Sequence, residues 1–156
     1  MFLFYDLFRL LSRYLTRGQI EDIARAYLYS ADAHEAQFRT SGEPYIIHPI
    51  AVCEMLAKVH MDKDTIMAAI LHDVVEDTPI TIEQIETEFG VKVAELVEGV
   101  TKITQLSGRT KAETQAESLR KMILAMVADV RVIVIKLADR MHNMETIGAM
   151  APKKQA

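Results

Sequence analysis

The stretch Ala69-Ile-Leu-His72-Asp73-Val-Val-Glu76-Asp77-Thr-Pro79 joins an apolar run to four ionisable side chains. On a helix, Glu76 lies about one turn beyond the adjacent pair His72 and Asp73, and Asp77 lies one turn beyond Asp73, so the four share a neighbouring arc. Burying several carboxylates beside a core is costly unless they are paired or bind a cation. Histidine and aspartate are good ligands for borderline divalent metals, so the stretch predicts a metal-binding helix.

Two further residues complete a candidate ligand set. His48 lies in Tyr45-Ile-Ile-His48-Pro49, where Pro49 suits the first position of a helix, and Asp139 lies in an otherwise apolar helical stretch. With His72 and Asp73 they supply two imidazoles and two carboxylates from three separate helices. That set suits Mn²⁺, Fe²⁺ or Zn²⁺ with positions left for water and substrate. A His-Asp dipeptide alone is common by chance, and it is the full spacing that favours a metal site.

Length and composition predict a single helical domain. The chain has 156 residues, half of them hydrophobic, with 6 Gly, 4 Pro and no Trp. This composition excludes collagen-like and wholly disordered classes, and we predict an all-α fold. Apolar spacing, caps and turn signals place helices at about 2–15, 19–38, 49–59, 63–75, 81–89, 91–103, 112–127 and 130–146. The β-branched run 130–135 could form a strand, but no other strand-like run exists to pair with it.

The charge is divided unevenly along the chain. Residues 1–100 carry 8 Lys and Arg against 17 Asp and Glu, a balance of −9, and residues 101–156 carry 10 against 5, a balance of +5, which together give the net −4. An acidic part could hold a cation and a basic part could attract an anion. The single cysteine, Cys53, argues for a reducing compartment, and the sequence shows neither a membrane span of ~20 apolar residues nor a signal peptide. We therefore expect a cytoplasmic protein.

Four strings around these residues carry a resemblance to a known family. They are Phe38-Arg39-Thr-Ser41-Gly-Glu-Pro-Tyr-Ile-Ile-His48-Pro49, Leu71-His72-Asp73-Val-Val-Glu76-Asp77-Thr78, Val97-Glu-Gly99-Val-Thr-Lys102 and Lys136-Leu-Ala-Asp139-Arg140-Met-His142-Asn143-Met144. The order His, His-Asp, Asp resembles the HD-domain metal phosphohydrolases, and the strings resemble the N-terminal hydrolase domain of RelA/SpoT-type alarmone enzymes, most of all the SpoT type. The resemblance implies the all-α HD fold, with residues 1–156 forming one hydrolase domain.

The resemblance also implies an activity and roles for individual residues. The activity is Mn²⁺-dependent removal of the 3′-pyrophosphate from the alarmones ppGpp and pppGpp, which yields GDP or GTP plus pyrophosphate and ends the stringent response. Mn²⁺ is implied ahead of Fe²⁺ or Zn²⁺, and because the chain has five histidines in all, too few for a heavily His-ligated dinuclear site, we expect one ion per chain. The implied roles are metal binding for His48, His72, Asp73 and Asp139, catalysis for Glu76 and Asp77, stacking on guanine for Arg39, a place near the base for Ser41, and ribose and phosphate contacts for Asn143 and Thr146. Lys102, Arg109, Lys111 and Arg140 are further candidates for phosphate binding.

The chain departs from the family in two positions and in length. Thr40 stands where many members have Lys, and Ser118 stands where Asn is usual. Family members continue with further helices and a synthetase domain, so we expect either a fragment of a longer multidomain chain that carries regulatory domains, or a small stand-alone hydrolase. We expect neither nucleic acid nor a membrane as a partner of this domain.

Two other functions stay open at this point. The chain could be a regulatory or binding HD module with little activity in this short form, although such a module has no need of both the ligand set and the Glu-Asp pair. It could also be an HD phosphohydrolase acting on another nucleotide, such as a dNTP, against which the string from Arg39 to Pro49 argues.

The remaining histidines, the methionines and the cysteine receive structural interpretations. We expect His34 to be packed or hydrogen-bonded, His60 to be a solvated helix end, and His142 to support a metal ligand rather than to bind the metal. Cys53 is expected to be a buried, inert thiol. The methionines at helical spacing are expected in the core; these are Met122, Met126, Met141 and Met144.

Overall fold

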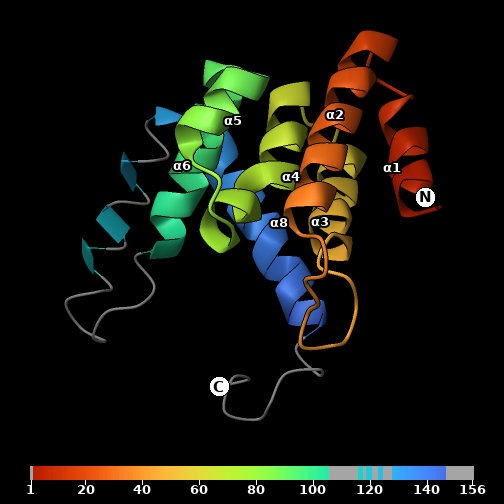
Figure 1. The fold of residues 1–156 in the computed structure, drawn as a ribbon. Helices are drawn as coiled ribbons and strands as arrows, with labels where there is room; N and C mark the ends of the chain where they lie inside the picture. The colour runs from red at the N-terminus through yellow and green to blue at the C-terminus, as the bar shows by residue number, and fades with distance from the viewer. Residues whose placement is uncertain (1, 106–115, 118, 121–122, 125–127, 147–156) are drawn as a thin grey trace.

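A computed structural model describes residues 2–105, 116–117, 119–120, 123–124 and 128–146, and over these residues it contains seven helices and no strand (Figure 1). The all-α prediction is confirmed. The helices are α1 Phe2–Leu11, α2 Arg17–Ala33, α3 Ile47–Lys58, α4 Lys63–Asp77, α5 Ile82–Phe89, α6 Val91–Gln105 and α8 Arg131–Glu145.

Helix α4 is the centre of the fold. It packs against α2, α3, α6 and α8, and Figure 1 shows it with α2 and α3 on one side and α5 and α6 on the other. Every residue from Thr65 to Val74 is buried. A helix that is apolar on all sides is stable only when other elements surround it. The polar residues at the end of the same helix are therefore carried into the interior.

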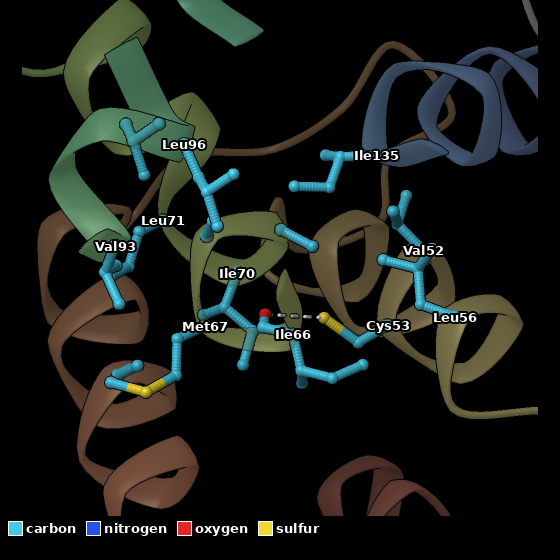
Figure 2. Packing of buried hydrophobic residues seen from close by; sticks show 14 of the residues in the cluster. Val52, Cys53, Leu56, Ile66, Met67, Ile70, Leu71, Val93, Leu96 and Ile135 are labelled. Carbon is cyan, nitrogen blue, oxygen red and sulfur yellow. Dashed lines mark hydrogen bonds between the residues drawn. The ribbon is translucent and has the colours of Figure 1, made fainter. Parts of the chain in front are cut away.

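Part of the core lies where α4 meets α3, α6 and α8. In Figure 2, Ile66, Met67, Ile70 and Leu71 of α4 lie among side chains from α3, α6 and α8. The labelled neighbours are Val52, Cys53 and Leu56 of α3, Val93 and Leu96 of α6, and Ile135 of α8. The Cys53 thiol donates a hydrogen bond to the Ile66 carbonyl at 3.5 Å, and burial raises the pKa of this thiol. The predicted burial of Cys53 is thus confirmed, and a raised thiol pKa is typical of an unreactive cysteine.

Glycine is required where α6 crosses α8. A Cβ atom at Gly99 would lie 2.8 Å from Cγ2 and 3.3 Å from Cγ1 of Val132. Real Cβ atoms essentially never approach another heavy atom this closely, so the absent side chain lets the two helix backbones come together. This contact is one of those that position α8, which also packs against α3 and α4.

Several helix ends differ from the sequence prediction. Helix α1 ends at Leu11 rather than near residue 15, and the hydroxyl of Tyr14, beyond its end, donates to the Met61 carbonyl at 2.8 Å. Helix α2 begins at Arg17, because Thr16 and Gln19 form a capping box that the prediction missed. The capping box predicted for α5 is present.

The ends that matter for the site are those of α2, α3 and α4. Helix α2 ends at Ala33 rather than near residue 38, and Ala36 then takes a positive φ of 62° before Phe38 forms a single bridge with Pro44. Helix α3 begins at Ile47, two residues before Pro49, so His48 lies inside its first turn. Helix α4 continues to Asp77, two residues further than predicted.

The C-terminal third gives one confirmation and one correction. The run 130–135 is helical, as predicted, since it opens α8. The helix predicted at 112–127 lies mostly outside the described residues, as do Met122 and Met126. The expectation that Met141 and Met144 are core residues is wrong: both are exposed, because α8 turns Val132, Ile135 and Ala138 towards the core and leaves these methionines on the opposite side. None of the described helices is long and apolar enough to cross a membrane.

Candidate metal centre

Three helices bring the predicted ligand set together. His48 comes from the first turn of α3, His72 and Asp73 from the last turns of α4, and Asp139 from the middle of α8, and all four are buried. Ligand atoms of His48, His72 and Asp139 all lie within 4.8 Å of one another. Asp73 adjoins this group, with its carboxylate oxygens 3.0 Å from His72 Nε2 and 3.7 Å from His48 Nε2.

The His72 ring is oriented by its own helix. Its Nδ1 donates to the Ala69 carbonyl at 2.7 Å, because a carbonyl oxygen can only accept. Its Nε2 therefore faces the carboxylates, where it is buried and has no hydrogen-bond partner among the described residues, although an Asp73 oxygen lies 3.0 Å away as an ion-pair contact. Burial lowers the pKa of His72, but the interactions with Asp73, the Asp139 charge and the hydrogen bond to Ala69 together outweigh burial, and the pKa is raised to about 9.

Both aspartates are held in their ionised form. Burial alone would raise the pKa of Asp73, yet the interactions with His72 and the His48 charge together bring it down to about 2. The pKa of Asp139 is lowered despite burial, chiefly by hydrogen bonds and charges from His48, His72 and Lys136. Lys136 Nζ donates to Asp139 Oδ2 at 2.7 Å. An orphaned buried imidazole nitrogen facing ionised carboxylates is a donor set that fits a divalent cation, so the residues present are suited to a metal.

Glu76 and Asp77 lie one turn further along α4, at the edge of the same group. Burial, followed by the Asp73 charge, raises the pKa of Glu76, and its Oε1 is buried with no hydrogen-bond partner in the part of the chain that the structure describes. Asp77 is exposed and accepts a hydrogen bond from the Tyr45 hydroxyl at 2.8 Å.

Tyr45 is a site residue that the sequence reasoning missed. Its hydroxyl lies 3.0 Å from Asp73 Oδ2 as well as 2.8 Å from Asp77 Oδ2, so it bridges a candidate ligand and a candidate catalytic carboxylate. Its ring stacks on His34, which confirms that His34 is a packed residue. Burial and the Asp73 charge raise the pKa of Tyr45, which keeps the hydroxyl protonated as a donor. The sequence feature that could have identified Tyr45 as a site residue is its position three residues before the candidate ligand His48.

An open cavity of about 410 Å³ lies beside these residues. Its lining includes His48, Asp73, Glu76, Asp77 and Asp139 of the predicted set. Arg39, Thr40 and Asn143 also line it. The cavity therefore joins the candidate metal ligands to three of the positions discussed for nucleotide binding.

Arg39 is bound to the same helix face that carries Asp139. Its Nη2 donates to Asn143 Oδ1 at 2.9 Å and to Thr146 Oγ1 at 3.4 Å, and its Nη1 lies 3.2 Å from His142 Nδ1. Asn143 in turn donates to Asp139 Oδ1 at 3.0 Å. The structure thus unites Arg39, Asn143 and Thr146. Ser41 is set apart from them: it is exposed, and its hydroxyl donates to Glu43 Oε2 at 3.4 Å.

Lys136 is a cation beside the site that the sequence analysis did not select. Lys136 lines the cavity, and its place three residues before Asp139 on one helix is a pattern that could have identified it. Lys102 is exposed and pairs with Glu98, and Arg140 is exposed, so neither lines the cavity. Arg109, Lys111 and Ser118 lie outside the described residues.

The two remaining histidines lie in different surroundings: His60 is a solvated residue, as predicted, and His142 adjoins a candidate ligand. His142 is buried and contacts His48 rather than the carboxylates, with their Nδ1 atoms 2.7 Å apart. Burial and the neighbouring His48 and Arg39 charges lower the pKa of His142. His60 is exposed at the end of α3, where it stacks on Tyr14.

The fold and the ligand arrangement agree with a family assignment. The family model described as the HD domain matches residues 26–156, and the chain belongs to the HD-domain family. Within that family it is similar to SpoT-type proteins, as the sequence strings predicted. It is 56% identical over 99% of its length to the bifunctional (p)ppGpp synthase/hydrolase SpoT of Escherichia coli K12 and 53% identical over 99% of its length to the guanosine-3′,5′-bis(diphosphate) 3′-pyrophosphohydrolase of Vibrio cholerae.

A solved structure shows the same likeness. A metazoan ortholog of SpoT, described as hydrolysing ppGpp, matches with a TM-score of 0.71 and 28% identity over 91% of this chain and 79% of its own. The chain spans 22% of the length of the two bacterial relatives.

Proposed function

We propose that this domain hydrolyses the 3′-pyrophosphate of ppGpp and pppGpp, yielding GDP or GTP plus pyrophosphate and so ending the stringent response. The observation that carries the proposal is the convergence of two buried imidazoles and two ionised carboxylates beside an open cavity that Glu76 also lines. The similarity to relatives named for this activity supports the choice of substrate.

The proposed cofactor is one Mn²⁺ ion, which His48, His72, Asp73 and Asp139 would hold. When bound, such an ion polarises a phosphate oxygen and lowers the pKa of a water molecule. Deprotonated imidazole and carboxylate groups are needed to bind it, so binding should release protons.

Glu76 is the proposed general base. Its raised pKa and its unpartnered Oε1 make it the carboxylate of the site best able to take a proton from an attacking water and pass it to the leaving group. Asp77, held by the Tyr45 hydroxyl, is the proposed orienting carboxylate. Lys136 balances the negative charge that the phosphates add to a group of aspartates.

The proposed substrate contacts require a rearrangement of Arg39. Its guanidinium is now bonded to Asn143 and Thr146, so it must leave both before it can stack on a guanine ring. The same movement frees Asn143 and Thr146 for the ribose and the phosphates. Ser41, exposed on the loop that carries Arg39, is proposed to approach the base only once that loop has closed.

We also propose the setting in which the domain acts. Residues 1–156 form a single HD hydrolase domain that belongs to a longer cytoplasmic chain with regulatory domains. The share of the relatives that this chain covers supports the longer chain.

The decisive experiment incubates the folded, Mn²⁺-loaded chain with ppGpp and follows pyrophosphate and GDP by anion-exchange chromatography. We expect release of both products, loss of release with excess chelator, and loss in Asp73→Ala but not in Asp32→Ala, which removes an exposed carboxylate of α2 away from the site. dGTP in a parallel reaction tests the other-nucleotide alternative. A folded, metal-loaded protein that leaves ppGpp intact would refute the proposed activity.

A further inference from the structure

His142 lies directly behind the candidate ligand His48. It is on α8, three residues after Asp139, and it is buried. Its Nδ1 is 2.7 Å from Nδ1 of His48 and 3.2 Å from Nη1 of Arg39. The two imidazole rings are 4.9 Å apart at their centroids.

The partners of this one nitrogen decide which atoms carry protons. A guanidinium has only donors, so His142 Nδ1 must accept from Arg39 and carries no proton itself. In the shorter contact, between the two imidazoles, one nitrogen must then donate, and that nitrogen is Nδ1 of His48. The hydrogen-bond network therefore assigns a proton to Nδ1 of His48.

This assignment determines what His48 presents on its other side. With Nδ1 protonated, Nε2 of a neutral imidazole carries the lone pair, and it points at Asp139 Oδ1 from 2.8 Å. A contact this short needs either a second proton, on His48 Nε2, or a metal ion bound by both atoms, and at the proposed site the ion takes the place of that proton. His72 is held in the matching state, with Nδ1 donating to Ala69 and Nε2 turned to the same point.

We propose that His142 is a positioning residue that accepts the Nδ1 proton of His48 and thereby turns the His48 Nε2 lone pair towards the metal position. The backbone carbonyl of Ala69 does the same for His72. Arg39 reinforces this state of His142, because its guanidinium can bond to Nδ1 only while that nitrogen is unprotonated. The inference rests on the proposed metal site, and it adds a residue that does not touch the metal.

The first experiment measures affinity for Mn²⁺ alone, from the electron paramagnetic resonance signal of the free ion. Removing a partner that orients a metal-binding histidine typically weakens metal affinity by about 10- to 100-fold, and we expect that loss in His142→Leu. His142→Asn places an amide oxygen near the position of Nδ1, so it should restore most of the affinity. His60→Asn, on the surface at the end of α3, is the matched control and should bind as the wild type does.

The outcomes separate this inference from the metal site itself. A wild-type chain that binds no Mn²⁺ refutes the proposed site. If the wild-type chain and His142→Leu bind Mn²⁺ equally well, the role of His142 is refuted and the metal site is not. Failure of His142→Asn to recover the affinity also counts against the role of His142.

A second measurement needs no variant. In the Zn²⁺-loaded wild-type chain, long-range ¹H–¹⁵N correlation spectra distinguish the protonated ring nitrogen of each histidine from the bare one. We expect Nδ1–H on His48 and a bare Nδ1 on His142. A protonated Nδ1 on His142 would overturn the inference.

Discussion

The close approach of α6 and α8 gives a prediction that can be worked out from distances. Gly99→Ala adds a methyl group 2.8 Å from Cγ2 and 3.3 Å from Cγ1 of Val132. Neither of these methyl groups is the end of a flexible chain, since a valine in a helix is held at one χ1 rotamer. The added atom must therefore push α8 away from α6.

Two opposing effects set the size of the change. Alanine in place of glycine within a helix stabilises by about 1 kcal/mol, whereas overpacking a well-packed contact costs about 1–3 kcal/mol. We expect Gly99→Ala to be destabilised by up to about 2 kcal/mol. Gly18→Ala is the matched control, because a Cβ atom at Gly18, in the first turn of α2, has nothing within 4 Å. It should be neutral or stabilised by up to about 1 kcal/mol.

The assay is urea denaturation of the metal-free chain. Removing the Val132 methyl groups should rescue Gly99→Ala, so the double mutant with Val132→Ala should show a favourable coupling energy of about 1–3 kcal/mol. Val132 lies two turns before Asp139 on α8, so Gly99→Ala should also weaken Mn²⁺ binding. Gly99→Ala that is as stable as Gly18→Ala, or zero coupling to Val132, would refute the reasoning.

Three further predictions concern the site. Glu76→Gln should bind Mn²⁺ with wild-type affinity and lose about 10²- to 10⁴-fold in turnover of ppGpp, because it removes a proton acceptor and not a ligand. Loss of Mn²⁺ binding in this variant would contradict the proposed role of Glu76 as a general base. Tyr45→Phe removes the hydroxyl shared by Asp73 and Asp77, so kcat should fall while folding, followed by circular dichroism, is retained; unchanged kcat would contradict this. The His72–Asp73 pair should stabilise the metal-free chain most between pH 3.8 and 6.5, the ordinary pKa values of the two groups. The His72 contribution is lost as pH rises through about 9, and the Asp73 contribution is lost as pH falls through about 2. The difference in urea midpoint between the wild type and Asp73→Asn, measured with chelator, should therefore decrease on both sides of this range. A difference that stays constant from pH 5 to 10 would contradict the pairing.

The helices and the identity of the ligand set could be predicted because their signals are local. The apolar run before His72 predicts a buried helix whatever surrounds it, and the Thr81–Gln84 capping box acts within four residues. Likewise, a cluster of carboxylates and imidazoles beside apolar stretches predicts a cation by its charge alone. The sequence by itself therefore determined the all-α class, most helix positions and the residues that the structure brings together around His72.

Only the tertiary structure decided which side chains contact the candidate ligands and orient them. Three contacts of the site join residues that are 28 to 107 positions apart in the sequence: Tyr45 with α4, Arg39 with α8, and His48 with His142. Which residues meet in these contacts depends on where the helices cross. The same crossings expose Met141 and Met144 and turn His142 and Lys136 inwards, although all four lie on one short stretch of sequence. Sequence spacing specifies which side chains share a helix face, but the direction of that face is set by packing against Gly99 and the core.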